Sequence, residues 1–235
     1  MNNNFDRLYT VELFKKLNYN RLQEFHDIVE LAAEICGTPI ALITLLDSET
    51  NHFVAKVGID MNNDSLEASF CQYTILQNDV LIVNDTLKDL RFIENPKVTD
   101  LGVRFYAGAA LKANNGHKIG SLCVIDVEPK NLTPLQIKTL EILSRQATML
   151  MELELAQKLL TEQLSDLETQ NKKLMNIAQV HSHEFRRPVA SLLGLMNIIS
   201  DEKYIASKQC LLMMEEAVKE LDEKIHMVVE YTQII

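Results

Sequence analysis

The chain has 235 residues, of which 47% are hydrophobic, and its formal net charge is −10. This length allows one large domain or two small ones, and this composition supports a sizeable core rather than global disorder. An acidic chain repels phosphate backbones, so we expect no nucleic-acid partner. The longest apolar runs have the length of a strand, and the N-terminus lacks the basic and apolar regions of a signal peptide. We therefore expect a cytoplasmic protein with no membrane span.

The chain divides near residue 155. Helical and strand patterns mix in residues 1–155, which hold six of the seven glycines, and only helical patterns follow. Amphipathic helices are predicted over about residues 7–17 and 20–36. Gly37 and Pro39 then end the second helix, as a C-terminal cap and a helix breaker would.

The strand patterns of this N-terminal part follow one another closely. They are Ile40–Leu46, His52–Val57, Val80–Val83, Val103–Ala113 and Lys118–Val127. The sequence Asn114-Asn115-Gly116 separates the last two, and Asn-Gly is a strong hairpin signal. The pattern predicts an α+β domain in which helices flank a mostly antiparallel sheet.

One long helix is predicted from Thr133, which would cap it, with Pro134 in the first turn. Over residues 156–180 a heptad frame predicts a coiled-coil signalling helix. The d positions of this frame are Leu153, Leu160, Leu167, Leu174, His181, Pro188 and Leu195. Asn171 occupies an a position, where it either fixes the register of two strands or is merely tolerated.

The heptad frame is out of phase with the preceding helical stretch. A d position at Leu150 would be followed by Gln157, whereas the frame begins at Leu153. Two explanations stay open. The break passes rotation or strain between domains, or the two stretches pack on different neighbours.

A second helix is predicted after a polar turn at about Ser200–Lys203, because apolar residues from Leu211 to Ile235 keep three-four spacing. Residues 181–235 should therefore form an antiparallel helical hairpin. A lone hairpin leaves its apolar seam half covered. Two hairpins from two chains would close a four-helix bundle, so a homodimer is predicted.

One helical segment combines residue types that suit phosphoryl transfer. They are His183, Glu184, Arg186, Arg187 and Pro188. With His181 at a d position, His183 falls at f and faces solvent. Glu184 could accept the proton of the second ring nitrogen, and the two arginines could stabilise the transferred charge. Pro188 removes one helical hydrogen bond, so we expect the helix to bend or loosen there. The alternative is a solvated face without function.

The segment Ser182–Pro188 resembles the H-box of sensor histidine kinases of two-component systems. The resemblance covers roughly residues 165–235, the dimerisation and histidine-phosphotransfer domain of that family. It implies that His183 is the phosphoacceptor, Glu184 its base, and a response-regulator receiver domain the partner. Many family members have Thr or Asn at the position of Arg187, where this residue positions water for dephosphorylation, so phosphatase activity is not implied.

Family kinases continue into an ATP-binding domain with glycine-rich boxes. No glycine follows Gly194, and the sequence ends at Ile235. We therefore expect no cofactor in this chain, with ATP acting only through a separate or missing kinase domain, in cis or in trans. The chain resembles a protein-histidine kinase but should not autophosphorylate alone, and its status as an enzyme stays open.

The N-terminal part resembles GAF sensor domains over about residues 5–155. The resemblance rests on Ser69–Cys71, Val83–Asp85, Asp89–Phe92, Arg104–Gly108, Gly120–Asp126 and Leu132–Gln136. It implies a pocket on one sheet face, lined by elements near Cys71, Asp85 and Tyr106. GAF domains bind cyclic nucleotides, tetrapyrroles, haem or nothing, so no ligand follows. From its residue type alone, Cys71 is either a buried small hydrophobe or a chromophore-attachment thiol, and Asp85 and Asp89 are turn or cap residues.

The four cysteines are scattered and form no CxxC pair, which predicts reduced thiols. His181 and His183 are two residues apart and would point in different directions on a helix, so no metal site is predicted. Two functions stay open. In the first, a GAF-sensed input controls phosphorylation of His183 and relay to a response-regulator aspartate. In the second, a dimeric ligand-sensing module with a vestigial histidine acts by binding alone.

Overall fold

A computed structural model describes the backbone of residues 2–19, 23–201 and 205–233. Within these ranges it leaves undescribed the side chains of residues 2–3, 178–183, 200–201 and 227–233. The chain forms two compact units, Met1–Leu159 and Leu160–Ile235. Among the described residues, no helix is both long and apolar enough to cross a membrane.

Within the described residues, the first unit is built on a six-stranded sheet of order β3-β2-β1-β6-β5-β4 in which every pairing is antiparallel. The strands are β1 (Ile40–Leu46), β2 (Thr50–Val57), β3 (Asn63–Ser65), β4 (Leu81–Val83), β5 (Phe105–Lys112) and β6 (Lys118–Asp126). The sequence predicted all of these except β3, and the predicted β5–β6 hairpin is confirmed. β3 escaped prediction because its three residues are all polar and show no alternation.

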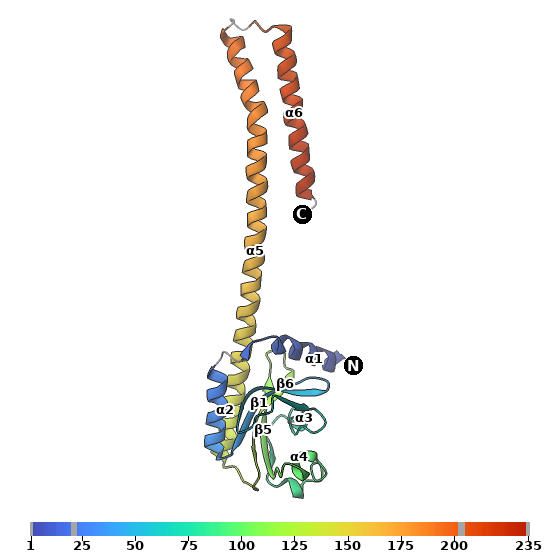
Figure 1. The fold of residues 1–235 in the computed structure, drawn as a ribbon, viewed down its shortest axis with the longest axis vertical. Coiled ribbons are helices and arrows are strands. Elements are labelled where there is room, and N and C mark those ends of the chain that lie inside the picture. The colour runs from blue at the N-terminus through green and yellow to red at the C-terminus, as the bar shows by residue number, and fades with distance from the viewer. Residues whose placement is uncertain (1, 20–22, 202–204, 234–235) are drawn as a thin grey trace. The chain divides into compact units, whose positions relative to one another are not determined.

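Helices cover both faces of the sheet (Figure 1). On one face lie α1 (Asn2–Lys15), α2 (Gln23–Cys36) and the first turns of α5 (Pro134–Asp201). On the other lie the short helices α3 (Cys71–Thr74) and α4 (Pro96–Thr99). A 3-10 turn, η2 (Thr86–Lys88), follows β4. The α+β class expected from the sequence is confirmed.

Alternate residues of the central strands supply two separate cores. In β1, Ala41, Ile43 and Leu45 pack in the core beneath α2 and α5. Leu42 and Leu46 of the same strand belong to the core beneath α3 and α4. Successive side chains of a strand point to opposite faces, so a sheet covered on both sides needs apolar residues at nearly every position.

Asp47 joins α1 to the turn between β1 and β2. Its Oδ1 accepts the amides of Glu49 and Thr50 at 2.9 and 2.7 Å. Its Oδ2 accepts Lys15 Nζ at 2.8 Å and lies 2.7 Å from His52 Nε2. Partial burial raises the pKa of Asp47, but these hydrogen bonds outweigh it and hold the pKa well below the usual 3.8.

The helix α5 begins at a reciprocal cap. Thr133 Oγ1 accepts the Gln136 amide at 3.3 Å, and Gln136 Oε1 accepts the Thr133 amide at 2.8 Å. This capping box confirms the predicted helix start. Leu140 and Ala147 of the first turns are fully buried in the core of the first unit. The start of α5 is therefore part of the globular domain.

The second unit consists of the rest of α5 and α6 (Lys208–Gln233), the helical hairpin expected from the sequence. Leu195 on α5 and Cys210 and Ala217 on α6 are buried. The heptad positions Leu160, Leu164, Leu167 and Leu174 are 52–58% exposed. An apolar seam on α5 thus has no cover within the described part of this chain.

We predict that Asp47→Asn lowers the free energy of unfolding by about 1–3 kcal/mol at pH 7, because an amide cannot accept the same set of charged donors. The folded-state pKa of Asp47 is depressed, so its stabilisation is present above about pH 4 and is lost as pH falls further. Urea denaturation of both proteins at pH 7 and pH 3 should show the difference shrinking at pH 3.

Glu12→Gln is the matched control, since Glu12 pairs with the same Lys15 at 2.8 Å but its side chain is 54% exposed. Its effect should stay below about 0.5 kcal/mol. An equal loss in the two variants would contradict a special role for Asp47.

Candidate functional site

Two cysteines far apart in the sequence meet inside the first unit. Cys71 begins α3, and Cys123 lies within β6 between Leu42 of β1 and Gly108 of β5. Their Sγ atoms are 3.9 Å apart. Both side chains are buried, with relative exposures of 3% and 0%. Sequence patterns do not reveal this pair, because 52 residues separate its members and only the fold brings them together.

Hydrogen-bond donors surround the sulfur of Cys71. Asn51 Nδ2 lies 3.8 Å away and the Tyr106 hydroxyl donates at 3.6 Å. Asn51 Nδ2 also donates to Ser69 Oγ at 3.0 Å. Within the described residues, Asn51 Oδ1 is a buried oxygen without a hydrogen-bond partner. The amide whose nitrogen contacts Cys71 therefore keeps an unpaired acceptor oxygen.

The pKa values of the two thiols move in opposite directions. The hydrogen bond with Cys123 lowers the pKa of Cys71 well below its usual range, although burial opposes this. The same hydrogen bond, with burial, raises the pKa of Cys123 well above its usual range. Positive charge on Lys97 also favours the thiolate of Cys71. The donors around Cys71, Asn51 Nδ2 and the Tyr106 hydroxyl, likewise favour a thiolate at this sulfur.

Aromatic rings fill the space around this pair. Phe70 stacks on Tyr106 with ring centroids 5.2 Å apart, and Phe92 lies 4.6 Å from Phe70. The Tyr106 hydroxyl meets Thr74 Oγ1 at 2.6 Å, and burial raises the pKa of Tyr106 well above its usual value. A Cβ at Gly108 would come within 2.3 Å of that hydroxyl, so glycine is needed there. The interior of this sheet face is occupied by the chain's own side chains.

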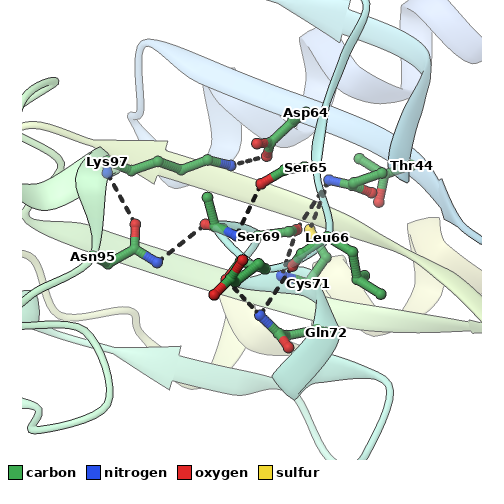
Figure 2. A network of polar contacts seen from close by, with 12 residues as sticks. Thr44, Asp64, Ser65, Leu66, Ser69, Cys71, Gln72, Asn95 and Lys97 are labelled. Carbon is green, nitrogen blue, oxygen red and sulfur yellow. Dashed lines mark hydrogen bonds and ion pairs between the residues drawn. The ribbon is translucent and has the colours of Figure 1, made fainter. Parts of the chain in front are cut away.

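Contacts with α4 hold β3 and the loop before α3 in place (Figure 2). Lys97 forms an ion pair with Asp64 and lies 5.9 Å from the ring centre of Phe70. Asn95 accepts the Lys97 amide at 2.9 Å and donates to the carbonyl of Ala68 at 3.1 Å. These contacts hold α4 against the loop that precedes Cys71.

The residues predicted to line a pocket lie in two places. Cys71 and Tyr106 meet in the buried cluster. Asp85 instead accepts the Leu87 amide at 3.2 Å and pairs with Arg104 at 3.0 Å. Asp89 accepts the amide of the residue two positions on, at 3.1 Å. The prediction that Asp85 and Asp89 serve as cap or turn residues is confirmed.

The second predicted site lies on α5, which runs without interruption through Pro188. The side chain of His183 lies outside the described residues, so its predicted exposure stays a prediction. Around it, Glu184 is half-buried, Arg186 and Arg187 are exposed, and Pro188 is buried. Two arginines next to the histidine are therefore accessible to an anionic group.

Pro188 removes one helical hydrogen bond beside His183. Proline has no N–H, so the carbonyl of Glu184 loses the helical hydrogen bond it would accept four residues on. Lys224 of α6 donates to this carbonyl oxygen at 3.4 Å. Lys224 also pairs with Glu220 at 3.0 Å, and its side chain is 18% exposed. The sequence did not point to Lys224, because its partner lies 40 residues away on another helix.

Residues 20–151 match the GAF domain family model, which is more than half of the chain. The chain therefore belongs to the GAF domain family, and its first unit is a sensory and regulatory signalling module. Cyclic di-GMP phosphodiesterase PA2567 of Pseudomonas aeruginosa is 41% identical over 128 residues. That match covers 54% of this chain and 22% of the relative, so the chain spans about a fifth of the relative's length.

Solved structures with the same kind of fold include the blue-light-absorbing form of the PixJ GAF domain of Thermosynechococcus elongatus. It is 14% identical, covers 63% of this chain and 97% of its own, and has a TM-score of 0.49. A domain of a protein described as a two-component sensor histidine kinase from Sinorhizobium meliloti 1021 is 17% identical, with a TM-score of 0.46. It covers 59% of this chain and 99% of its own.

We predict that Tyr106→Phe lowers the free energy of unfolding by about 1–3 kcal/mol, because the buried Thr74 hydroxyl loses its partner at 2.6 Å. Urea denaturation measures the change. Tyr73→Phe is the control, since Tyr73 is half-buried and packs edge-on against Phe92 at 5.1 Å. Equal stability of Tyr106→Phe and the wild type would contradict the role of this hydroxyl.

Lys224→Met keeps an apolar side chain but removes the ammonium group. We predict that amide hydrogen exchange over residues 184–192 becomes about two- to fivefold faster, which corresponds to a loss of about 0.5–1 kcal/mol. Mass spectrometry of peptic fragments measures this. Lys219→Met removes an exposed pair with Glu215 and should leave the segment unchanged. Equal exchange in the two variants would show that Lys224 does not support this turn.

Proposed function

We propose that the chain is a phosphorelay signalling protein in which the GAF unit controls phosphorylation of His183. The phosphoryl group would then pass to an aspartate on a response-regulator receiver domain. The segment Ser182–Pro188 carries the proposal, because it places a histidine, a carboxylate and two arginines within two helical turns. The exposure of Arg186 and Arg187 supports it, since a phosphoryl donor must reach this surface.

Each residue of the segment has a chemical role in this proposal. His183 attacks the phosphorus atom through one ring nitrogen, and Glu184 accepts the proton on the other. Arg186 and Arg187 stabilise the charge of the transferred group. Pro188 weakens the helix one turn later, and Lys224 limits that weakening through the freed carbonyl. The turn that bears His183 thus stays helical, with the Lys224 hydrogen bond supporting it where the proline removes one.

The exposed seam of α5 supports assembly as a homodimer. The leucines of this seam are spaced three and four apart and are half exposed in one chain. A second α5 that packs against them would bury them. Two hairpins would then form a four-helix bundle. The asparagine at position 171 would lie inside this seam, where it favours a two-stranded register.

The start of α5 offers a route from the GAF unit to His183. Leu140 and Ala147 are buried in the core beneath the sheet, so repacking of that core shifts the first turns of the helix. The helix then runs without interruption to the H-box-like segment. ATP would act through a separate catalytic domain. A phosphodiesterase activity is not proposed, because this chain matches about a fifth of the relative that has it.

The test exposes the full chain to two phosphoryl donors. These are labelled ATP with a purified ATP-binding domain of a histidine kinase, and phosphoramidate alone. We expect acid-labile label on the wild type and only background label on His183→Ala. Added receiver domain should then remove label from the wild type.

His226→Ala is the matched control, because His226 is an exposed histidine on α6. This variant should be labelled like the wild type. Equal label on wild type and His183→Ala, or none from either donor, would refute the phosphorelay. That result would favour the second function, a sensing module with a vestigial histidine.

A further inference from the structure

We propose that Cys71 and Cys123 form a peroxide-reactive dithiol that closes reversibly to a disulfide inside the GAF unit. The proposal rests on four features of the buried cluster: the approach of two sulfur atoms, the donors around one of them, an unused acceptor beside it, and a short helix over it. It does not depend on phosphorylation of His183.

The first feature is distance. The two Sγ atoms are 3.9 Å apart without any bond between them. A disulfide needs about 2.05 Å, so the sulfur atoms must approach by roughly 1.9 Å. Cys36 and Cys210 are also buried free thiols, yet neither contacts another cysteine in the described part of the chain. The pairing of Cys71 with Cys123 is therefore specific to this site.

The second feature is an asymmetry that assigns the two roles. Cys71 Sγ accepts from Asn51 Nδ2 and the Tyr106 hydroxyl, and it lies against the Cys123 thiol. Donors around a sulfur stabilise its thiolate, which is the form that attacks peroxides. The pKa directions agree, with that of Cys71 lowered and that of Cys123 raised. Cys71 is the attacking sulfur and Cys123 the resolving one.

The third feature is the unpaired Asn51 Oδ1, a buried acceptor on the amide that already contacts Cys71. A sulfenic acid on Cys71 carries one O–H donor, which this oxygen can accept. Asn51 Oδ1 is therefore unpaired beside the resting thiols but could accept a hydrogen bond from the sulfenic acid. Asn51 itself is 1% exposed, so solvent does not supply the missing donor in this conformation.

The fourth feature concerns access. Cys71 is 3% exposed and belongs to α3, which has four residues, so an oxidant reaches the sulfur when this short helix opens locally. Hydrogen peroxide is close to water in size and can enter through such an opening. A bulky disulfide reagent cannot. The site is accordingly selective for small hydroperoxides.

The reaction balances with one hydroperoxide per pair of thiols. Cys71 sulfur attacks one peroxide oxygen, so that an S–O bond forms, the O–O bond breaks and one water leaves with the thiol proton. The thiol of Cys123 then attacks the sulfenic sulfur, an S–S bond forms, and the S–O bond breaks to release a second water. Two electrons pass from the two sulfur atoms to the peroxide, and an external thiol can return them.

The experiment treats the folded full chain with hydrogen peroxide, then unfolds it and blocks the remaining thiols with N-ethylmaleimide. We expect a cross-linked Cys71–Cys123 peptide that disappears on reduction. The pair should oxidise about tenfold faster than Cys36. In Cys123→Ser, the sulfenic-acid reagent dimedone should label Cys71. Glutathione disulfide should react more slowly than peroxide with the folded wild type.

Cys36→Ser and Cys210→Ser are matched controls and should leave the cross-link unchanged. Peptide mapping of the wild type needs no variant, so misfolding of a cysteine variant does not affect that result. The proposal is overturned by a cross-link that appears only after unfolding or by oxidation of all four cysteines at one rate. Dimedone labelling of Cys123 in Cys71→Ser, with Cys71 unlabelled in Cys123→Ser, would also overturn the assigned roles.

Discussion

The first unit depends on a sheet that is covered on both faces. Every polar group that enters either core must then find a partner inside the protein, because water is excluded from both sides. The face beneath α2 and α5 is mostly apolar, and the buried hydroxyls of Ser144 and Thr148 bond to carbonyls of α5 itself. The face beneath α3 carries sulfur, hydroxyl and amide groups, and these bond to one another around Cys71. The same requirement thus produces a largely apolar core on one side and a hydrogen-bonded cluster with two thiols on the other.

The two units differ in how they obtain their stability. The GAF unit encloses its cores within one chain. The helical unit leaves leucines exposed along α5 and buries only a few side chains between its helices. The helix α5 thus begins in an enclosed core and continues into a unit whose leucines are exposed. Exposed leucines of this kind are what the proposed association of two chains would bury.

Regular periodicity made most of the fold predictable. The strands β1 and β6 followed from apolar runs of strand length, and the helices α5 and α6 from heptad or three-four spacing and the cap at Thr133. The short elements β3, α3 and α4 did not, since three or four residues cannot display a period. The sequence pointed to Cys71 and Tyr106, which the structure brings together, while the segment Glu184–Pro188 stays a prediction. The contacts of Cys71 with Cys123 and of Lys224 with Glu184 depend on tertiary register, which local patterns do not encode.

The bond from Lys224 also bears on which fragment of the chain can be studied alone. A peptide that stops at Asp201 would contain the whole of α5 but would leave the Glu184 carbonyl without this donor. Its turn around His183 would then relax in a way that the intact chain does not. A fragment that keeps the intact chain's contacts around His183 must therefore include α6 at least as far as residue 224.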